Sequence, residues 1–226
     1  MNRNTITSTI FLICACILYL TEVTAAQSKT INKNFQNADL IFHTSKSNQS
    51  YAIMWASQSL LSHVGLIEMD SSGKYYVIEA IAKVSRTPLN QWINRGRFNR
   101  YEVYRYKNLS EDQKKLIIEN AKKYLGRKYD VSFSSHNQEI YCSELVAYAF
   151  NDSQIKIGQY QKISSLNVDN SIVKSLVKKR WKTHPLCKKP KINFDQCWQN
   201  ILADELITPV SLTQDPHIEK IYTSYK

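Results

Sequence analysis

Two apolar segments joined by a short turn constrain the fold of this chain more than any other feature. Residues 62–69 (SHVGLIEM) and 75–81 (YYVIEAI) have the composition of β-strands, and the sequence DSSG at 70–73 is a turn cluster. The pair is therefore predicted to form an antiparallel hairpin. Further strands are predicted at 38–42 and 101–106.

Helical patterns dominate the second half. The clearest helix spans about 111–125, with Ser110 as N-cap, Gln113 completing a capping box and Gly126 ending it. Its buried stripe is predicted to contain Leu116, Ile117, Ala121, Tyr124 and Leu125. Other predicted helical segments are 50–61, 89–94, 142–150 and 171–181, and residues 206–210 are expected to return to the sheet. Strands followed by helix, loop and helix indicate an α+β fold, with a mostly antiparallel sheet packed against helices.

The N-terminal segment has the layout of a secretory signal peptide. A polar start with Arg3 precedes the apolar run Ile10–Leu20, and small residues follow as far as Ala25 and Ala26. Eleven apolar residues are too few to span a bilayer, which needs about 20. We expect residues 1–26 to be a signal peptide cleaved near Ala25 or Ala26, so that the protein is exported to the periplasm or secreted. A lipoprotein signal ending at Cys16 and a retained anchor are the alternatives.

The remaining residues, 27–226, are enough for a single domain with its own core. Of the five cysteines, two lie in the predicted signal peptide. Export favours disulfides, and Cys187 and Cys197 lie close together in sequence, so a bridge between them is predicted. Cys142 is then the odd thiol, which marks it as a candidate reactive group.

The formal net charge is +11. Basic residues are densest at 178–191, which suggests binding to an anionic lipid or wall polymer, although a solvated basic face explains the charge equally well. No nucleic-acid-binding motif accompanies the charge, so no nucleic-acid partner is expected.

Cys142 lies in IYCSELV (140–146), where an apolar lead-in is followed by an amphipathic helix. In the first turn of a helix, unpaired backbone N–H groups and the helix dipole stabilise a thiolate. A lowered thiol pKa makes the cysteine a nucleophile, and the same N–H groups could form half of an oxyanion hole. Glu144 opposes this effect unless it points away or pairs with a cation.

His63 is the candidate base. It opens the strand beginning SHVG (62–65), where Gly65 shares its face and leaves room beside the imidazole. Glu79 lies in the apolar segment YVIEA, where a carboxylate is costly unless it is paired. If the hairpin loop has an odd number of residues, Glu79 shares a face with His63 and can orient the ring. The alternative is that Glu79 pairs with Lys83 or Arg86.

The other four histidines have weaker support. His43 and His136 lie in polar surroundings, and surface roles are expected for His184 and His217. A metal site formed by Cys142 and two histidines is poorly supported, because the chain has no Cys-x-x-Cys and no His-Glu-x-x-His. No metal and no cofactor are expected.

The segments AKKYLGRKY (121–129) and YCSELV (141–146) resemble the nucleophile region of NlpC-type papain-like peptidases. The histidine motif precedes the cysteine here, which resembles the circularly permuted branch. Within that branch the chain is similar to the YiiX/YaeF amidase-like family. The likeness covers roughly residues 38–181 and resumes near 206–209. It rests on short motifs that follow one another in the same order as in the family. They are DLIF (39–42), SHVG (62–65), IEA (78–80), TPL (87–89) with QWI (91–93), YD (129–130) with SF (132–133), and YCSE (141–144).

This resemblance implies a circularly permuted papain-like fold with Cys142 as nucleophile, His63 as base and Glu79 as orienting group. Tyr129 would lie beside the nucleophile, and Tyr141 and Ser143 flank it at the substrate site. The expected activity is hydrolysis of an amide-bearing envelope substrate, a peptide or an acyl-amide, through a thioester.

Three features depart from the family pattern. Ala38 replaces a common glycine, the glycine-rich segment of the wall peptidases is missing before the nucleophile, and Glu144 stands where they have glycine. A peptidoglycan stem peptide is therefore not indicated, and the segment with Cys187 and Cys197 has no assigned counterpart. Two alternative functions stay open: a non-catalytic protein that binds lipid or peptide, and a lipid acyltransferase.

Overall fold

Residues 34–226 are described by the structure, a computed structural model. The predicted signal peptide, its cleavage near Ala25 or Ala26 and the alternative at Cys16 lie outside these residues. From Phe35 to Lys226 the chain forms one unit. Within residues 34–226, no helix combines the length and the apolar character needed to cross a membrane.

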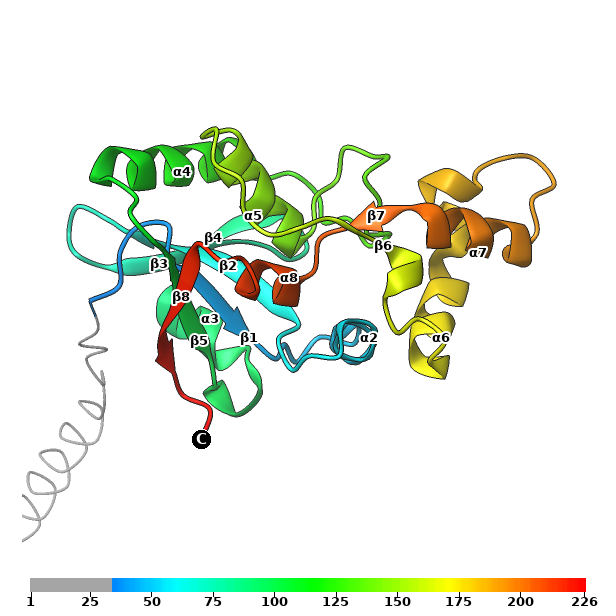
Figure 1. The fold of residues 1–226 in the computed structure, drawn as a ribbon, viewed down its shortest axis with the longest axis horizontal. Coiled ribbons are helices and arrows are strands. Elements are labelled where there is room, and N and C mark those ends of the chain that lie inside the picture. Colours follow the sequence, from blue (N-terminus) through cyan, green and yellow to red (C-terminus); the bar gives the residue numbers. More distant parts are fainter. Residues whose placement is uncertain (1–33) are drawn as a thin grey trace, which may run out of the picture. The chain divides into compact units, whose positions relative to one another are not determined.

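Six antiparallel strands form the main sheet (Figure 1), in the order β4-β3-β2-β1-β5-β8. They are β1 (Leu40–His43), β2 (His63–Met69), β3 (Tyr75–Ala80), β4 (Val84–Pro88), β5 (Glu102–Tyr106) and β8 (Ile218–Thr223). Met69 pairs with Tyr75, so the β2–β3 turn has five residues, and the predicted hairpin is confirmed. A second sheet pairs β6 (Gln161–Lys162) with β7 (Glu205–Leu206).

Helices α4 (Glu111–Lys123) and α5 (Cys142–Asn151) lie side by side over one face of the main sheet (Figure 1). Alternate strand residues, including Val64, Leu66 and Ile78, join the apolar side of α5 in the main core. The opposite face of the sheet is covered by α3 (Leu89–Asn94), whose Trp92 is fully buried. Side chains at odd-numbered positions of β2, such as His63, therefore point to the α3 side.

Other helical segments gather around a second apolar cluster. They are α2 (Ser50–Ser57), α6 (Ser171–Arg180), α7 (Phe194–Ala203) and the short turns at 163–165, 181–183 and 185–187, while α8 (Pro209–Thr213) packs against α5. The predicted bridge between Cys187 and Cys197 is present and ties the segment before α7 to that helix. Cys142 is the free cysteine among the described residues.

Local predictions held best where a specific side chain sets a boundary. The capping box of α4 is present, since Gln113 N–H donates to Ser110 Oγ and Ser110 N–H to Gln113 Oε1. The predicted buried stripe of this helix is partly wrong, because Leu116 and Leu125 are exposed while Ile118 is buried.

Other parts of the structure differ from the sequence-based expectations. Strand β4 and helix α7 were not predicted, and the return to the main sheet was placed too early. Residues 209–213 form α8, and β8 at 218–223 is the strand that rejoins the sheet. His184, expected at the surface, is buried, and its Nδ1 accepts a hydrogen bond from Leu186 N–H.

Candidate active site

Cys142 is the first residue of α5, and its side chain is only 2% exposed. Tyr141, the N-cap, has extended backbone geometry, so the chain enters the helix directly at the cysteine. This position places the thiol beside the N-terminal N–H groups of the helix, which carry a partial positive charge.

His63 and Glu79 are paired across the hairpin. The His63 Nε2 atom lies 2.8 Å from Glu79 Oε2. The five-residue turn puts both side chains on one face of adjacent strands. Because Nε2 is engaged by the carboxylate, Nδ1 is the ring nitrogen available to another partner.

The Cys142 thiol interacts with the same imidazole ring. Burial alone would raise the pKa of Cys142, but hydrogen bonds from His63 and the Val64 N–H, with the charge of the imidazolium, lower it. Burial alone would likewise lower the pKa of His63, but Cys142 and Glu79 raise it to about 9. The two shifts favour a thiolate–imidazolium pair at neutral pH.

Three groups hold the Glu79 carboxylate, which is fully buried. His63 contacts Oε2, while Thr87 Oγ1 donates to Oε1 at 2.6 Å and Arg95 forms an ion pair with the same Oε1. Burial would raise the pKa of Glu79, but these partners lower it and keep the group ionised. Arg86, one of the alternative partners considered from the sequence, pairs instead with Glu68.

Arg95 was missed because it follows the α3 helix and reaches Glu79 only through the tertiary fold. The sequence does indicate that such a partner exists, because a carboxylate in an apolar strand is costly to bury unless a cation pairs with it. From the sequence, the predicted basic partners are the nearby Lys83 and Arg86.

An aromatic wall lies behind the His63 ring. His43 and Trp92 stack with ring centroids 3.9 Å apart, and the His43 ring lies 5.3 Å from that of His63. Burial and the charge of His63 lower the pKa of His43 well below its usual value. His43, set aside in the sequence analysis, is therefore a neutral neighbour of the candidate base.

The other three predicted site residues surround the thiol. Burial and the nearby Cys142 charge raise the pKa of Tyr129 well above its usual value, so the hydroxyl keeps its proton. Gln49 Nε2 donates to the Tyr129 hydroxyl at 2.8 Å. Tyr141 and Ser143 line an apolar cavity together with Cys142.

Glu144 has no basic residue within ion-pair distance among the described residues. Its Oε1 accepts a hydrogen bond from the Tyr148 hydroxyl at 2.8 Å, and its Oε2 is buried without a partner in the described structure. Burial raises the pKa of Glu144 to about 7, which reduces the negative charge near the thiol. The expected conflict between Glu144 and the thiolate is thereby weakened.

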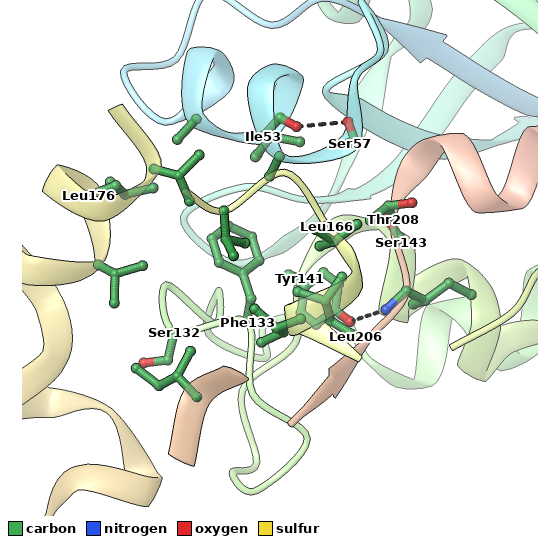
Figure 2. Close-up of a pocket in the computed structure, with 18 of the residues that line it drawn as sticks. Ile53, Ser57, Ser132, Phe133, Tyr141, Ser143, Leu166, Leu176, Leu206 and Thr208 are labelled. Carbon is green, nitrogen blue, oxygen red and sulfur yellow. Dashed lines mark hydrogen bonds between the residues drawn. The ribbon is translucent and has the colours of Figure 1, made fainter. Parts of the chain in front are cut away.

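Cys142 and His63 line two different hollows. Cys142 lies in the wall of the apolar cavity, which α2, α6, α7 and the loop before α5 enclose (Figure 2). His63 lies in the wall of a second, more polar pocket that includes Gln49, Arg95 and Tyr129. The candidate nucleophile and base therefore stand between an apolar and a polar compartment.

Comparisons with known proteins identify the family of this chain. Residues 34–222 match the family described as "Permuted papain-like amidase enzyme, YaeF/YiiX, C92 family". The protein YiiX of Escherichia coli strain K12 is 37% identical over 176 residues, covering 75% of this chain and 87% of that protein.

A solved structure, described as the metalloprotein YiiX from Escherichia coli O157:H7, has a TM-score of 0.74 at 32% sequence identity. It covers 84% of this chain and 98% of its own. The resemblance inferred from the motifs is confirmed, and the family match extends past 181 through the segment with the disulfide. The chain belongs to the YaeF/YiiX family of permuted papain-like amidases.

Proposed function

We propose that this protein hydrolyses an amide bond through a covalent thioester on Cys142. The observation that carries the proposal is the connected series Cys142, His63 and Glu79, in which the thiol pKa is lowered and the imidazole pKa is raised. A thiolate beside an imidazolium that a buried carboxylate orients is the arrangement used for acyl transfer to cysteine.

In the first step the Cys142 thiolate attacks the amide carbonyl carbon, and a C–S bond forms. The His63 imidazolium then gives its proton to the leaving nitrogen as the C–N bond breaks, leaving a thioester and a free amine. In the second step neutral His63 takes a proton from water, and the water oxygen attacks the thioester carbon. The C–S bond then breaks, the carboxylic acid leaves, and the Cys142 thiolate and His63 imidazolium are restored. Glu79 keeps the ring in position throughout.

In both steps a negative charge develops on the carbonyl oxygen, and hydrogen-bond donors must stabilise it. N–H groups of the first turn of α5 supply one side. Tyr129 supplies a second donor, because its hydroxyl is protonated and already accepts a hydrogen bond from Gln49.

A metal has no place in this mechanism. The related structure from Escherichia coli O157:H7 is described as a metalloprotein. In residues 34–226 of the present chain, no three His, Cys, Asp or Glu side chains converge in a geometry suited to a metal ion. The donor set therefore does not fit such a group, and no step is routed through one.

The place of action is proposed from the sequence. An exported protein would meet amide-bearing molecules of the cell envelope. The basic stretch at 178–191 exposes Lys178, Lys179, Lys182, Lys188, Lys189 and Lys191, which could bind an anionic lipid or wall polymer. Arg180 does not belong to this face, because it donates to Gln49 Oε1 and the Val131 carbonyl beside the site.

Iodoacetamide labelling of Cys142 at a series of pH values tests the thiolate–imidazolium pair. We expect rapid labelling well below the free thiol pKa of about 8.5, and a shift of the profile toward that value in His63→Ala. Identical profiles for the two proteins, both centred near the free value, would refute the proposal. Loss of amide hydrolysis in Cys142→Ala, which keeps the fold, links the labelled thiol to turnover.

A further inference from the structure

A series of hydrogen bonds reaches the candidate active site from the end of helix α6. Arg180, the last residue of α6, donates from Nη1 to Gln49 Oε1 at 3.1 Å. Gln49 Nε2 in turn donates to the Tyr129 hydroxyl at 2.8 Å. Tyr129 lines the polar pocket together with His63. The Arg180–Gln49–Tyr129 series therefore joins three segments that are far apart in the sequence and ends at the site.

The Gln49 side chain has no part in the helix that it precedes. Gln49 is the N-cap residue of α2, but its side chain makes no capping hydrogen bond, and glutamine is not among the residues that favour this position. The two ends of its amide are used instead by Arg180 and Tyr129. The side chain thus connects distant segments rather than stabilising its own helix.

Arg180 lies in an unusual environment for a cation. Its side chain is partly buried, and within residues 34–226 no carboxylate lies within ion-pair distance of the guanidinium. Besides Gln49, its Nη1 has the Val131 carbonyl as acceptor, at 2.9 Å. Burial disfavours the charged form and lowers the pKa of Arg180. Two neutral acceptors offset only part of that cost, so stability alone does not explain a guanidinium at this position.

The guanidinium determines which way the Gln49 amide points. A guanidinium only donates hydrogen bonds, so the amide atom that faces Arg180 must be the oxygen. The NH₂ group then faces Tyr129 and donates to its hydroxyl. In the reverse orientation the amide oxygen would face Tyr129, and the hydroxyl would give its proton to that oxygen.

The Tyr129 hydroxyl therefore keeps its single proton for another acceptor. Among residues 34–226 the hydroxyl makes no hydrogen bond besides the one it accepts from Gln49. The ring is held edge-on against Phe133, and the Tyr129 backbone N–H donates to the Ala82 carbonyl at 3.1 Å. Since the residue is fixed on these sides, its free proton is available on the side of the polar pocket that it shares with His63.

Resting on the proposed function, we infer that Arg180 is a positioning residue, which holds the Gln49 amide so that the Tyr129 proton is kept for the substrate oxyanion. Arg180 does not touch the substrate and acts only through Gln49. Helix α6 packs in the second apolar cluster, so this cluster influences the reaction through one polar side chain.

Gln49→Glu separates this role from a structural one. The carboxylate keeps the size of the amide and accepts from Arg180 more strongly, so unfolding in urea should need an unchanged or higher concentration. Its second oxygen also accepts only, and it takes the Tyr129 proton. We expect kcat for amide hydrolysis to fall about 10²-fold, as in Tyr129→Phe, with little change in KM. A parental kcat in Gln49→Glu overturns the inference.

The double variant with Tyr129→Phe controls for the added charge. If the effect passes through the Tyr129 hydroxyl, Gln49→Glu should change kcat by no more than about twofold once that hydroxyl is absent. An undiminished fall in this background means that the new carboxylate acts directly on the Cys142–His63 pair, and it overturns the inference.

Arg180→Met removes the donor and keeps an unbranched apolar side chain. The Gln49 amide is then free to turn its oxygen toward Tyr129, and breaking that hydrogen bond should cost about three- to tenfold in kcat. This loss should vanish in the Tyr129→Phe background. Lys174→Met is the matched control, because it also removes one positive charge from α6, but at an exposed position paired with Asp169. Equal kcat values for these two variants overturn the inference.

Failure of this inference differs from failure of the proposed function. If the parent protein cleaves amides and labelling of Cys142 depends on His63, but Gln49→Glu and Arg180→Met turn over like the parent, Arg180 has a structural role and the hydrolase proposal stands. If the parent cleaves no amide and its labelling profile is that of a free thiol, the hydrolase proposal is wrong and the inference about Arg180 falls with it.

Discussion

Gly65 lies against Glu79 across the β2–β3 pair, and a β-carbon on Gly65 would come within 3.3 Å of Glu79 Cβ. It would also come 2.9 Å from the Ile78 carbonyl oxygen and contact the Val77 side chain even more closely. The strand that carries His63 can therefore approach the strand that carries Glu79 only because residue 65 has no side chain. Gly65 makes room for the close strand approach that supports the histidine–carboxylate pair.

Gly65→Ala is expected to separate the two strands locally. We expect a loss of about 1–3 kcal/mol in the free energy of unfolding, because the site is overpacked, and a fall in kcat, because His63 and Glu79 are misaligned. Urea denaturation and amide hydrolysis measure the two effects. Gly73→Ala is the matched control in the same hairpin: its φ of +77° strains an alanine, but the added carbon meets nothing within 4 Å. It should lower stability without changing kcat, and an equal loss of kcat in both variants would contradict this account.

The charge of Glu79 is expected to set the alkaline limit of activity. Glu79 and Cys142 raise the pKa of His63 to about 9 against the effect of burial, so the imidazolium that protonates the leaving amine is lost near pH 9. In Glu79→Gln the pKa of His63 should fall, because an opposite charge has been removed. The alkaline limb of kcat/KM then moves to lower pH, and kcat drops by roughly 10²-fold. A pH–rate profile measures both.

Glu68→Gln is the control for that change. Glu68 lies on β2 and, like Glu79, is a buried carboxylate. It pairs with Arg86 and Lys122 and has no contact with His63. We expect this variant to lose stability and to keep the alkaline limb of the parent enzyme. If both variants shift the limb alike, the effect reflects general loosening of the sheet rather than the charge beside His63.

The hydroxyl of Tyr129 is predicted to stabilise the oxyanion. Tyr129→Phe removes the donor but leaves the ring that packs edge-on against Phe133. Losing one such donor typically costs about 10²-fold or more in kcat, with little change in KM. The iodoacetamide profile of Cys142 should stay as in the parent, since the thiolate still has His63. A Phe variant with parental kcat would exclude Tyr129 from the reaction.

Sequence reasoning reached the hairpin and the nucleophile helix because each rests on local physics. The turn cluster at 70–73 and the apolar run of β3 predict the hairpin, but they leave the length of its loop open. The structure has five turn residues, 70–74, which place His63 and Glu79 on one face. The start of α5 at Cys142 follows from a change in hydrophobic pattern at that point. The motifs that carried the family resemblance lie on these same elements.

The parts that were missed depend on contacts distant in sequence. Strand β4 carries Ser85 and Arg86, which look like a polar loop, and it becomes a strand by pairing with β3. Arg95 meets Glu79 only after α3 folds over the sheet. The cavity at Cys142 has walls from several segments that are far apart in the sequence, so no single stretch of sequence reveals it.

The bridge between Cys187 and Cys197 is expected to stabilise the second apolar cluster, to which α6 and α7 both contribute. The two residues are 10 apart in sequence, and closing a loop of that size in the unfolded chain is worth about 2–3 kcal/mol. The double variant Cys187→Ala with Cys197→Ala should therefore unfold at lower urea concentration, followed by the fluorescence of Trp181 and Trp198. Labelling of Cys142 without urea should keep the parental pH profile, because the thiolate depends on the main core and not on this segment. An unchanged unfolding midpoint would mean that apolar packing alone holds the second cluster together.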